Sequence, residues 1–198
     1  MMTIPPGEEG VQDDPTLLAR VVKGDHEAFT VLMRRHEDRV FGVCLRLMGN
    51  RSAALDATQE TFLTLYRKAG QYRGTAAVGT WLYRIAVNTC YDLLRKEKRR
   101  PLEALPDHLD PADPSSTDAF TSVELRPSVE AALATLSPEF RAVVVLSDVN
   151  AYSLPDVARV LELPVGTVKS RLFRARRQLA AVLGNLSTGP EHPTGAEP

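Results

Sequence analysis

The chain has 198 residues and a mass of 21.8 kDa, enough for one large domain or two small ones. Its 43% hydrophobic and 25% charged residues are ordinary for a globular protein, and no apolar run approaches the roughly 20 residues of a membrane span. The first residues hold neither a basic region nor an apolar block, so we expect no export signal and a cytoplasmic protein. Cys44 and Cys90 have no metal-ligand or CxxC spacing and are interpreted as small buried hydrophobes rather than a redox pair.

The net charge of −1 conceals a segregation of charge along the chain. Residues 14–100 carry +7 and residues 126–184 carry +3, whereas residues 101–125 contain six acidic residues and no Lys or Arg. Clustered Lys and Arg are what a polyanionic partner requires, because each phosphate contact releases condensed counterions. Chance segregation on solvated helix faces would give the same totals, so charge alone leaves both interpretations open.

Helical periodicity predicts four helices in the first basic block, 14–100. The first three are expected to end at glycines, and a glycine-bounded loop at 72–79 precedes the fourth, which continues into the basic run 95–100. The residues expected to open or cap these helices are Asp14, Asp25, Ser52 and Thr80.

Residues 101–125 are expected to form a flexible linker, because they combine acidic charge and several prolines with little apolar periodicity. The second basic block, 126–184, predicts four shorter helices with breaks near Ser137-Pro138, Asn150 and Pro164. No alternating strand pattern is convincing anywhere. We therefore predict an all-α protein of two small helical domains joined by an acidic, proline-rich linker, with disordered segments at 1–13 and 185–198.

The last two helices of the second block form a predicted helix-turn-helix. Ser153 and Asp156 make a capping box for the first helix, residues 163–166 turn the chain, and the second helix starts near Thr167. Five basic residues and no acidic one lie between 169 and 177. Such a helix fits a major groove, where Lys and Arg reach guanine. The alternative is a helical hairpin with a solvated arginine face, although such a face usually includes Glu for i,i+4 pairs.

The fourth helix of the first block gives an independent indication of nucleic-acid binding. Aromatic rings stack on bases, amides read them and guanidinium groups hold phosphates, and the loop at 72–79 could receive an unstacked base. A tryptophan at a helix start is otherwise often part of the core, and Asp92 is expected to pair with Arg95 or Lys96. At 100° per residue, one stripe of this helix contains Trp81, Arg84, Asn88, Asp92, Arg95 and Arg99.

The third helix carries polar residues in its first turns and hydrophobic residues further along. Asp56, Gln59 and Glu60 are followed by Phe62 and Tyr66. The acidic groups could simply complement the helix dipole. An exposed polar patch beside hydrophobic residues could instead dock a protein partner.

Taken together, these segments resemble a bacterial RNA polymerase sigma factor of the extracytoplasmic-function (ECF) group of the sigma-70 family. Residues 56–62 resemble the segment that binds core polymerase, and residues 80–95 resemble the segment that melts and reads the −10 promoter element. Residues 136–141 together with 164–176 resemble the domain that reads the −35 element. The resemblance covers about residues 14–184. Glu162 stands where the family usually has glycine, and Ala57-Thr58 are smaller or more polar than the aliphatic residues common there.

The resemblance implies an alternative sigma factor that binds core RNA polymerase, recognises the −35 and −10 elements and promotes DNA melting. Residues 14–100 would be region 2, on the clamp coiled coil of the largest subunit, and residues 126–184 region 4, on the flap and on −35 DNA. An anti-sigma factor, often membrane-anchored in this family, is a further implied partner. The acidic linker would pass through the RNA-exit path, where its charge would imitate a transcript.

The resemblance also assigns residues to each contact. The implied core-polymerase contacts are Asp56, Gln59, Glu60 and Phe62. The implied −10 contacts are Trp81, Arg84, Asn88, Arg95, Lys96 and Arg99. The implied −35 contacts are Thr167, Lys169, Ser170, Arg171, Phe173, Arg174, Arg176 and Arg177.

Three other classes of function were weighed. An ordinary helix-turn-helix regulator would explain the recognition helix but leaves the first hundred residues unexplained. An adaptor without DNA affinity conflicts with that basic helix. An enzyme is disfavoured because the four histidines are scattered and no catalytic, glycine-rich or metal-ligand spacing is present, so we expect no catalytic residue, cofactor, metal or small-molecule substrate. His36, on an apolar stripe, is expected in or at the edge of the core.

Overall fold

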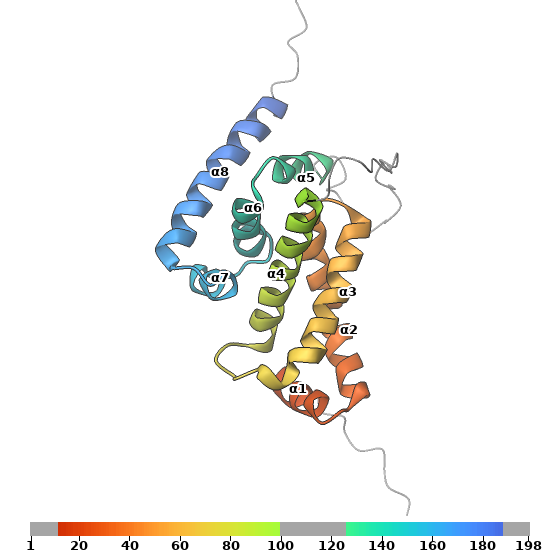
Figure 1. Ribbon diagram of the computed structural model, residues 1–198. Helices are drawn as coiled ribbons and strands as arrows, with labels where there is room; N and C mark the ends of the chain where they lie inside the picture. The colour runs from red at the N-terminus through yellow and green to blue at the C-terminus, as the bar shows by residue number, and fades with distance from the viewer. Residues whose placement is uncertain (1–11, 100–125, 188–198) are drawn as a thin grey trace, which may run out of the picture.

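The computed structural model describes residues 12–99 and 126–187, which form the two helical units in Figure 1. The predicted linker at 101–125 lies outside the described residues, as do most of the two terminal segments. Within the described ranges every regular element is helical, as predicted, and the β-like run at 143–146 is part of a helical segment. None of the helices in these ranges has both the length and the apolar character needed to cross a bilayer.

The first unit contains four α-helices and one short 3-10 turn. They are α1 (Asp14–Val22), α2 (His26–Met48), α3 (Arg51–Lys68), η1 (Ala69–Gln71) and α4 (Val78–Arg99).

Asp14 opens α1 as predicted, and Asp13 before it is the cap. Asn50 rather than Ser52 caps α3, because a cap is the extended residue just before the helix and its side chain accepts an N–H two or three residues on. Thr80 caps nothing, since α4 begins at Val78 and Thr80 is buried inside it. Asp25 caps α2 as predicted, accepting from the backbone N–H of Ala28 at 3.0 Å.

The second unit also contains four helices, broken at the predicted places. They are α5 (Arg126–Ala134), α6 (Pro138–Val144), which continues into the π-helical turn η2 (Val145–Val149), α7 (Leu154–Leu161) and α8 (Val165–Ser187).

The recognition helix α8 starts two residues earlier than predicted and ends three residues beyond the predicted domain end at 184. The early start follows from Pro164, whose carbonyl accepts from the N–H groups of Thr167 and Val168 at 2.9 and 3.1 Å. The Ser153 hydroxyl accepts from the Asp156 N–H, so Ser153 caps α7 as predicted.

Helix α2 occupies the centre of the first unit and packs against α1, α3 and α4. Its apolar stripe is buried, and Cys44 on α2 and Cys90 on α4 are both fully enclosed, as predicted. His36 is 7% exposed and its Nε2 lies 2.7 Å from Oδ2 of Asp14, so this ring joins α1 to α2 at the edge of the core. In the second unit, Val143 and Val168 are buried between α6, α7 and α8. They belong to the same apolar cluster as the core of the first unit, because α7 packs on α4 and α6 packs on α2.

Candidate nucleic-acid and polymerase interface

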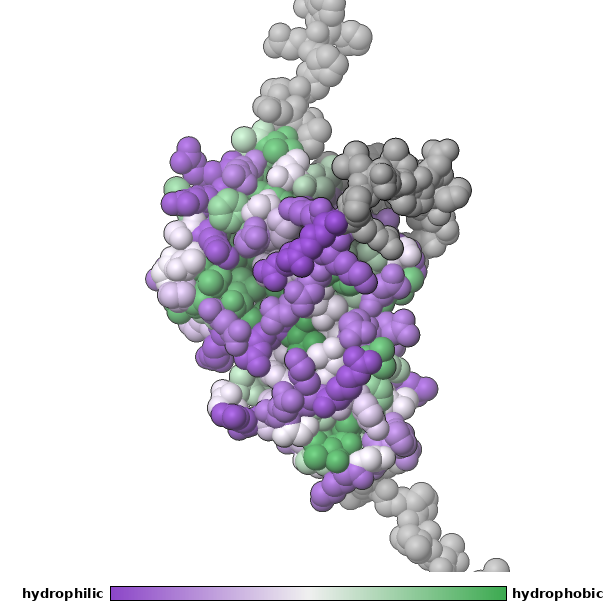
Figure 2. All heavy atoms as spheres, viewed as in Figure 1, coloured by the Kyte–Doolittle hydropathy of each residue, from purple (hydrophilic) through white to green (hydrophobic). Residues whose placement is uncertain are grey.

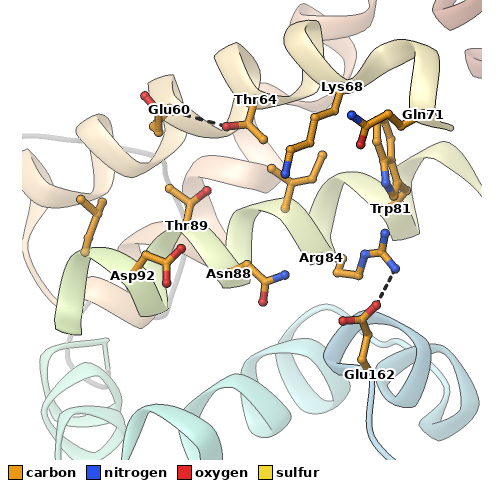
Figure 3. Close-up of a pocket in the computed structure, with 12 residues that line it drawn as sticks. Glu60, Thr64, Lys68, Gln71, Trp81, Arg84, Asn88, Thr89, Asp92 and Glu162 are labelled. Carbon is orange, nitrogen blue, oxygen red and sulfur yellow. Dashed lines mark hydrogen bonds and ion pairs between the residues drawn. The ribbon is translucent and has the colours of Figure 1, made fainter. Parts of the chain in front are cut away.

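A groove of about 520 Å³ runs between α3 and α4 and collects most of the predicted −10 stripe (Figure 3). Trp81, Arg84, Asn88 and Asp92 line it from α4, as their helical spacing predicts. The opposite wall was not anticipated from the sequence. It consists of polar residues spaced four apart on α3, followed by a residue of η1, namely Glu60, Thr64, Lys68 and Gln71.

Trp81 belongs both to the core and to the groove. The ring is half-buried against the core and lies 5.5 Å from the ring of Tyr72, centroid to centroid. On its other side is a second cavity of about 410 Å³, which the loop after η1 lines. The Tyr72 hydroxyl donates to the carbonyl of Ala76 at 2.6 Å and so holds this loop. Packing therefore fixes the ring, as the core interpretation expects, and one part of it remains at the groove, so its contact with nucleic acid stays a prediction.

The C-terminal end of α4 is strongly basic. Figure 2 shows the most hydrophilic patch of this face of the molecule over this end of the helix. The predicted −10 residues Arg95, Lys96 and Arg99 are exposed there, beyond the groove rather than in its wall. Arg95 lies 3.4 Å from Asp92, which is the predicted pairing. This basic patch continues α4 beyond the groove, whose own charged residues are the cations Lys68 and Arg84 and the carboxylates Glu60, Asp92 and Glu162.

The outer face of α3 carries the residues predicted to contact polymerase, with one exception. Asp56, Gln59 and Glu60 are exposed, and Glu60 forms an ion pair with Arg67 at 3.1 Å. Phe62, however, is 5% exposed and lies in the core, because it shares the inward face of α3 with Leu65. Its ring is not presented to a partner here. The apolar side chains that α3 does expose are Leu55, Leu63 and Tyr66, of which only Tyr66 was noted from the sequence.

The predicted −35 residues fall into two groups on α8. Lys169, Ser170, Arg174 and Arg177 are exposed on the outer face, and Phe173 is the most exposed large apolar side chain of the described residues, at 65%. The other three are less free, because an ion pair holds Arg176 and partial burial restricts Thr167 and Arg171.

Arg176 is held by an ion pair with Asp148 of η2. Its Nε and Nη2 donate to the two carboxylate oxygens at 3.0 and 2.6 Å. These hydrogen bonds hold the pKa of Asp148 below its ordinary range. Thr167 and Arg171 are half-buried. Burial raises the pKa of Tyr91 on α4 to about 12, and the charge of Arg171 opposes this shift.

The turn between α7 and α8 reaches the groove. Glu162 ends α7 in the left-handed conformation, with φ 54°, and its carboxylate lies 2.8 Å from Nη1 of Arg84 (Figure 3). The backbone conformation of this turn could not be predicted from the sequence, because Glu162 stands where the family usually has glycine. The glutamate adopts the conformation that glycine would adopt with less strain.

Two family models match the chain. Sigma-70 region 2 matches residues 32–100, and Sigma-70, region 4 matches residues 126–179. The ECF RNA polymerase sigma factor SigM of Mycobacterium tuberculosis is 42% identical over 178 residues, which span 90% of this chain and 88% of that protein. This chain belongs to the sigma-70 family. It is an ECF-type alternative sigma factor that directs promoter recognition in transcription initiation.

Other sigma factors are also similar to this chain in sequence or in fold. The RNA polymerase sigma-H factor of Pseudomonas aeruginosa is 33% identical over 182 residues, covering 87% of this chain and 94% of that protein. The solved structure of CnrH in complex with the cytosolic domain of CnrY matches 87% of this chain and 97% of CnrH, with a TM-score of 0.64 and 27% identity. The sigma factor RpoE of Bartonella quintana, solved with the anti-sigma factor NepR, shares the fold, with a TM-score of 0.65 at 23% identity over 79% of this chain and 96% of RpoE.

Family membership decides between the functions weighed from the sequence. An ordinary helix-turn-helix regulator leaves the first hundred residues unexplained, whereas the region 2 match accounts for most of them. The chain is a transcription initiation factor. Within the part of the chain that the structure describes, no group of His, Cys, Asp or Glu side chains is arranged to hold a metal ion.

Proposed function

We propose that this sigma factor divides its work between three surfaces: the outer face of α3, the groove with the basic patch at the end of α4, and the outer face of α8. The observation that carries the proposal is the groove, which brings an aromatic ring, an amide and a guanidinium group together in Trp81, Asn88 and Arg84. The groove would take separated bases of the −10 element, the α3 face would bind core polymerase, and α8 would read the −35 element.

The chemistry of the groove supports the capture of single-stranded DNA. An aromatic ring stacks on any base, an amide offers both donors and an acceptor to a base edge, and cations hold the phosphates. Lys68 on the opposite wall and Arg84 place positive charge on both sides of the strand. The loop before α4 borders the second cavity, which offers space for an unstacked base. Arg95, Lys96 and Arg99 would then follow the DNA backbone beyond the groove.

The outer face of α3 supports binding to a helical protein surface such as the clamp coiled coil. Leu55 and Leu63 are 51% and 41% exposed beside the polar groups of Asp56, Gln59 and Glu60. An apolar centre with a polar rim is the usual composition of a protein interface. Phe62 would support this face from beneath rather than touch the partner.

The exposed face of α8 supports reading of duplex DNA. Lys169, Arg174 and Arg177 would contact phosphates or guanines, Ser170 would contact a phosphate, and Phe173 would contact a thymine methyl group. Arg176 would join them only by giving up its ion pair with Asp148. Thr167 and Arg171 would support the turn side of the same helix.

The proposal extends to regulation and to the linker. Two structural relatives were solved with regulators bound, CnrH with CnrY and RpoE with NepR, which supports an anti-sigma factor as a partner of this chain. Residues 101–125 would occupy the RNA-exit path as an acidic transcript mimic. We place the protein in the cytoplasm, where polymerase meets the chromosome.

Run-off transcription with purified core polymerase across genomic promoters tests the function. The full chain should direct initiation at defined positions, and Trp81→Ala and Asn88→Ala should reduce promoter opening while polymerase binding persists. Leu63→Asp on α3 should instead reduce polymerase binding. Ser52→Ala, an exposed substitution near the start of α3, is the control and should change neither. Failure of the wild-type chain to direct initiation at any defined site would overturn the proposal.

A further inference from the structure

An ion pair joins the recognition helix α8 to the end of the helical segment that precedes the helix-turn-helix. Nε and Nη2 of Arg176 on α8 donate to the two carboxylate oxygens of Asp148 in η2, at 3.0 and 2.6 Å. The two residues are 28 positions apart in the chain, so the pair exists only once the unit has folded. A guanidinium that meets a carboxylate through two N–H groups has a fixed direction as well as a fixed distance. The contact therefore restrains the orientation of α8 relative to η2.

Asp148 is itself held in place on the η2 side of the pair. The Ser147 hydroxyl donates to Oδ1 of Asp148 at 2.7 Å, in addition to the two hydrogen bonds from the guanidinium. The π-helical turn that carries Asp148 is closed by Asn150, whose backbone N–H and side-chain amide both donate to the carbonyl of Val145, at 3.0 and 2.7 Å. Such turns are rare and often lie at functional sites. Asp148 is thus a fixed anchor at the end of α6 and η2.

Apolar packing alone restrains the rotation of α8 about its own axis only weakly. The helix packs on α6 and α7, and its buried stripe contains Val168, Leu172 and Ala175 (Figure 1). Hydrophobic burial is non-directional, so a small roll of the helix loses little of it. On the outer face, at about 5–6 Å from the axis, a roll of about 10° moves a side chain by about 1 Å. Groups that bind in a defined geometry must be held within about 0.5 Å. A directional contact therefore matters more for reading DNA than for burying the stripe.

Arg176 lies among the residues of the outer face but differs from them in what it contacts. Arg174 and Arg177 are exposed and form no ion pair within the described residues. The Arg176 side chain is 60% exposed and nevertheless contacts Asp148. Its hydrogen bonds lower the pKa of Asp148, so the carboxylate is ionised and the pair is intact at neutral pH. Arg176 is thus an exposed cation that the protein itself engages.

We propose that the ion pair between Asp148 and Arg176 is a brace that fixes the rotation of α8, which makes both residues positioning residues for the specific reading of duplex DNA. The inference rests on the proposed role of α8 in reading the −35 element. It predicts that the pair raises the preference for a −35 sequence over other duplexes without adding a phosphate contact.

Anisotropy with two labelled duplexes tests the brace on the full chain. One duplex carries the −35 sequence of a promoter found by run-off transcription, and the other has an arbitrary sequence. The ratio of the two dissociation constants measures specificity. Asp148→Asn keeps the size of the side chain but removes the charge that aligns Arg176. It should reduce the specificity ratio about twofold to fivefold, the range of one exposed ion pair, and Arg176→Gln should do the same.

Further variants separate positioning from charge. Arg176→Lys keeps the charge but lacks the planar pair of N–H groups, so it should also reduce the ratio, whereas a simple phosphate contact would survive this change. Combining Asp148→Asn with Arg176→Gln should reduce the ratio no further than either alone, because both remove the same contact. Glu130→Gln removes another exposed carboxylate of the second unit and should leave the ratio unchanged. In NMR spectra, the Nε–H signal of Arg176 should shift when Asp148→Asn removes its charged acceptor.

The outcomes distinguish this inference from the proposed function. A ratio that falls in the three single variants of the pair and not in Glu130→Gln supports the brace. If the wild type discriminates between the duplexes and these variants keep its ratio, the brace is overturned while the −35 role of α8 stands. Weaker binding to both duplexes alike also overturns the brace, because a loss of folded protein or of charge explains it. If the wild type does not discriminate at all, the −35 role of α8 is overturned, and the brace with it.

Discussion

The salt dependence of duplex binding offers a sharp test of the α8 surface. The sequence alone counts five cations between 169 and 177, and the structure separates them. Lys169, Arg174 and Arg177 are exposed, and none of them forms an ion pair within the described residues, whereas Arg176 is bound to Asp148 and Arg171 is half-buried. We therefore expect Arg174→Gln to remove one phosphate contact and Arg176→Gln to remove much less.

The expected magnitudes follow from counterion release. Each phosphate contact contributes about −0.9 to the slope of log binding constant against log salt concentration. Three free cations therefore give a slope of about −2.7, and five would give about −4.5. Between 50 and 200 mM salt, these slopes correspond to losses of roughly 40-fold and 500-fold in affinity. Arg174→Gln should reduce the magnitude of the measured slope by about 0.9, and Arg176→Gln by clearly less than that.

The assay is anisotropy with a labelled duplex of arbitrary sequence, titrated with the full chain at several salt concentrations. Lys23→Gln is the charge-matched control, because Lys23 is exposed on the turn after α1 in the other unit. It should leave the slope unchanged if the duplex binds α8. A slope unaltered by Arg174→Gln, or altered equally by Arg176→Gln, would refute the assignment of free and paired cations on α8.

Three further predictions concern the fold that supports these surfaces. Arg176 holds the pKa of Asp148 below its ordinary value of 3.8. The stability from this pair is therefore complete above pH 3.8 and is lost as the pH falls through the lower pKa of the folded state. In an NMR titration, Arg176→Gln should raise the pKa of Asp148. Cys44 and Cys90 should react with Ellman's reagent only as fast as the native chain opens, and rapid labelling in native buffer would contradict their enclosure. Leu82→Ala should reduce the free energy of unfolding by about 2–5 kcal/mol in urea denaturation, and a loss well under 1 kcal/mol would contradict its place in the core.

Much of the candidate site follows from helical spacing alone. The stripe from Trp81 to Asp92 lines the groove because residues three and four apart share one face of any helix. The opposite wall, with Thr64 and Lys68, has the same spacing on α3. It could not be assigned to the site, since spacing does not say which helix lies opposite.

The sequence by itself determined the helical class, the division into two units, the helix-turn-helix and the basic character of its outer face. These properties depend on residues close together in the chain, whose caps, periodicity and charge act locally. Tertiary structure alone decided that Phe62 faces the core, that Asp148 binds Arg176, and that Glu162 reaches Arg84. Periodicity fixes which face of a helix is apolar, but packing fixes what that face meets, and ion pairs between distant segments exist only once the packing has brought them together.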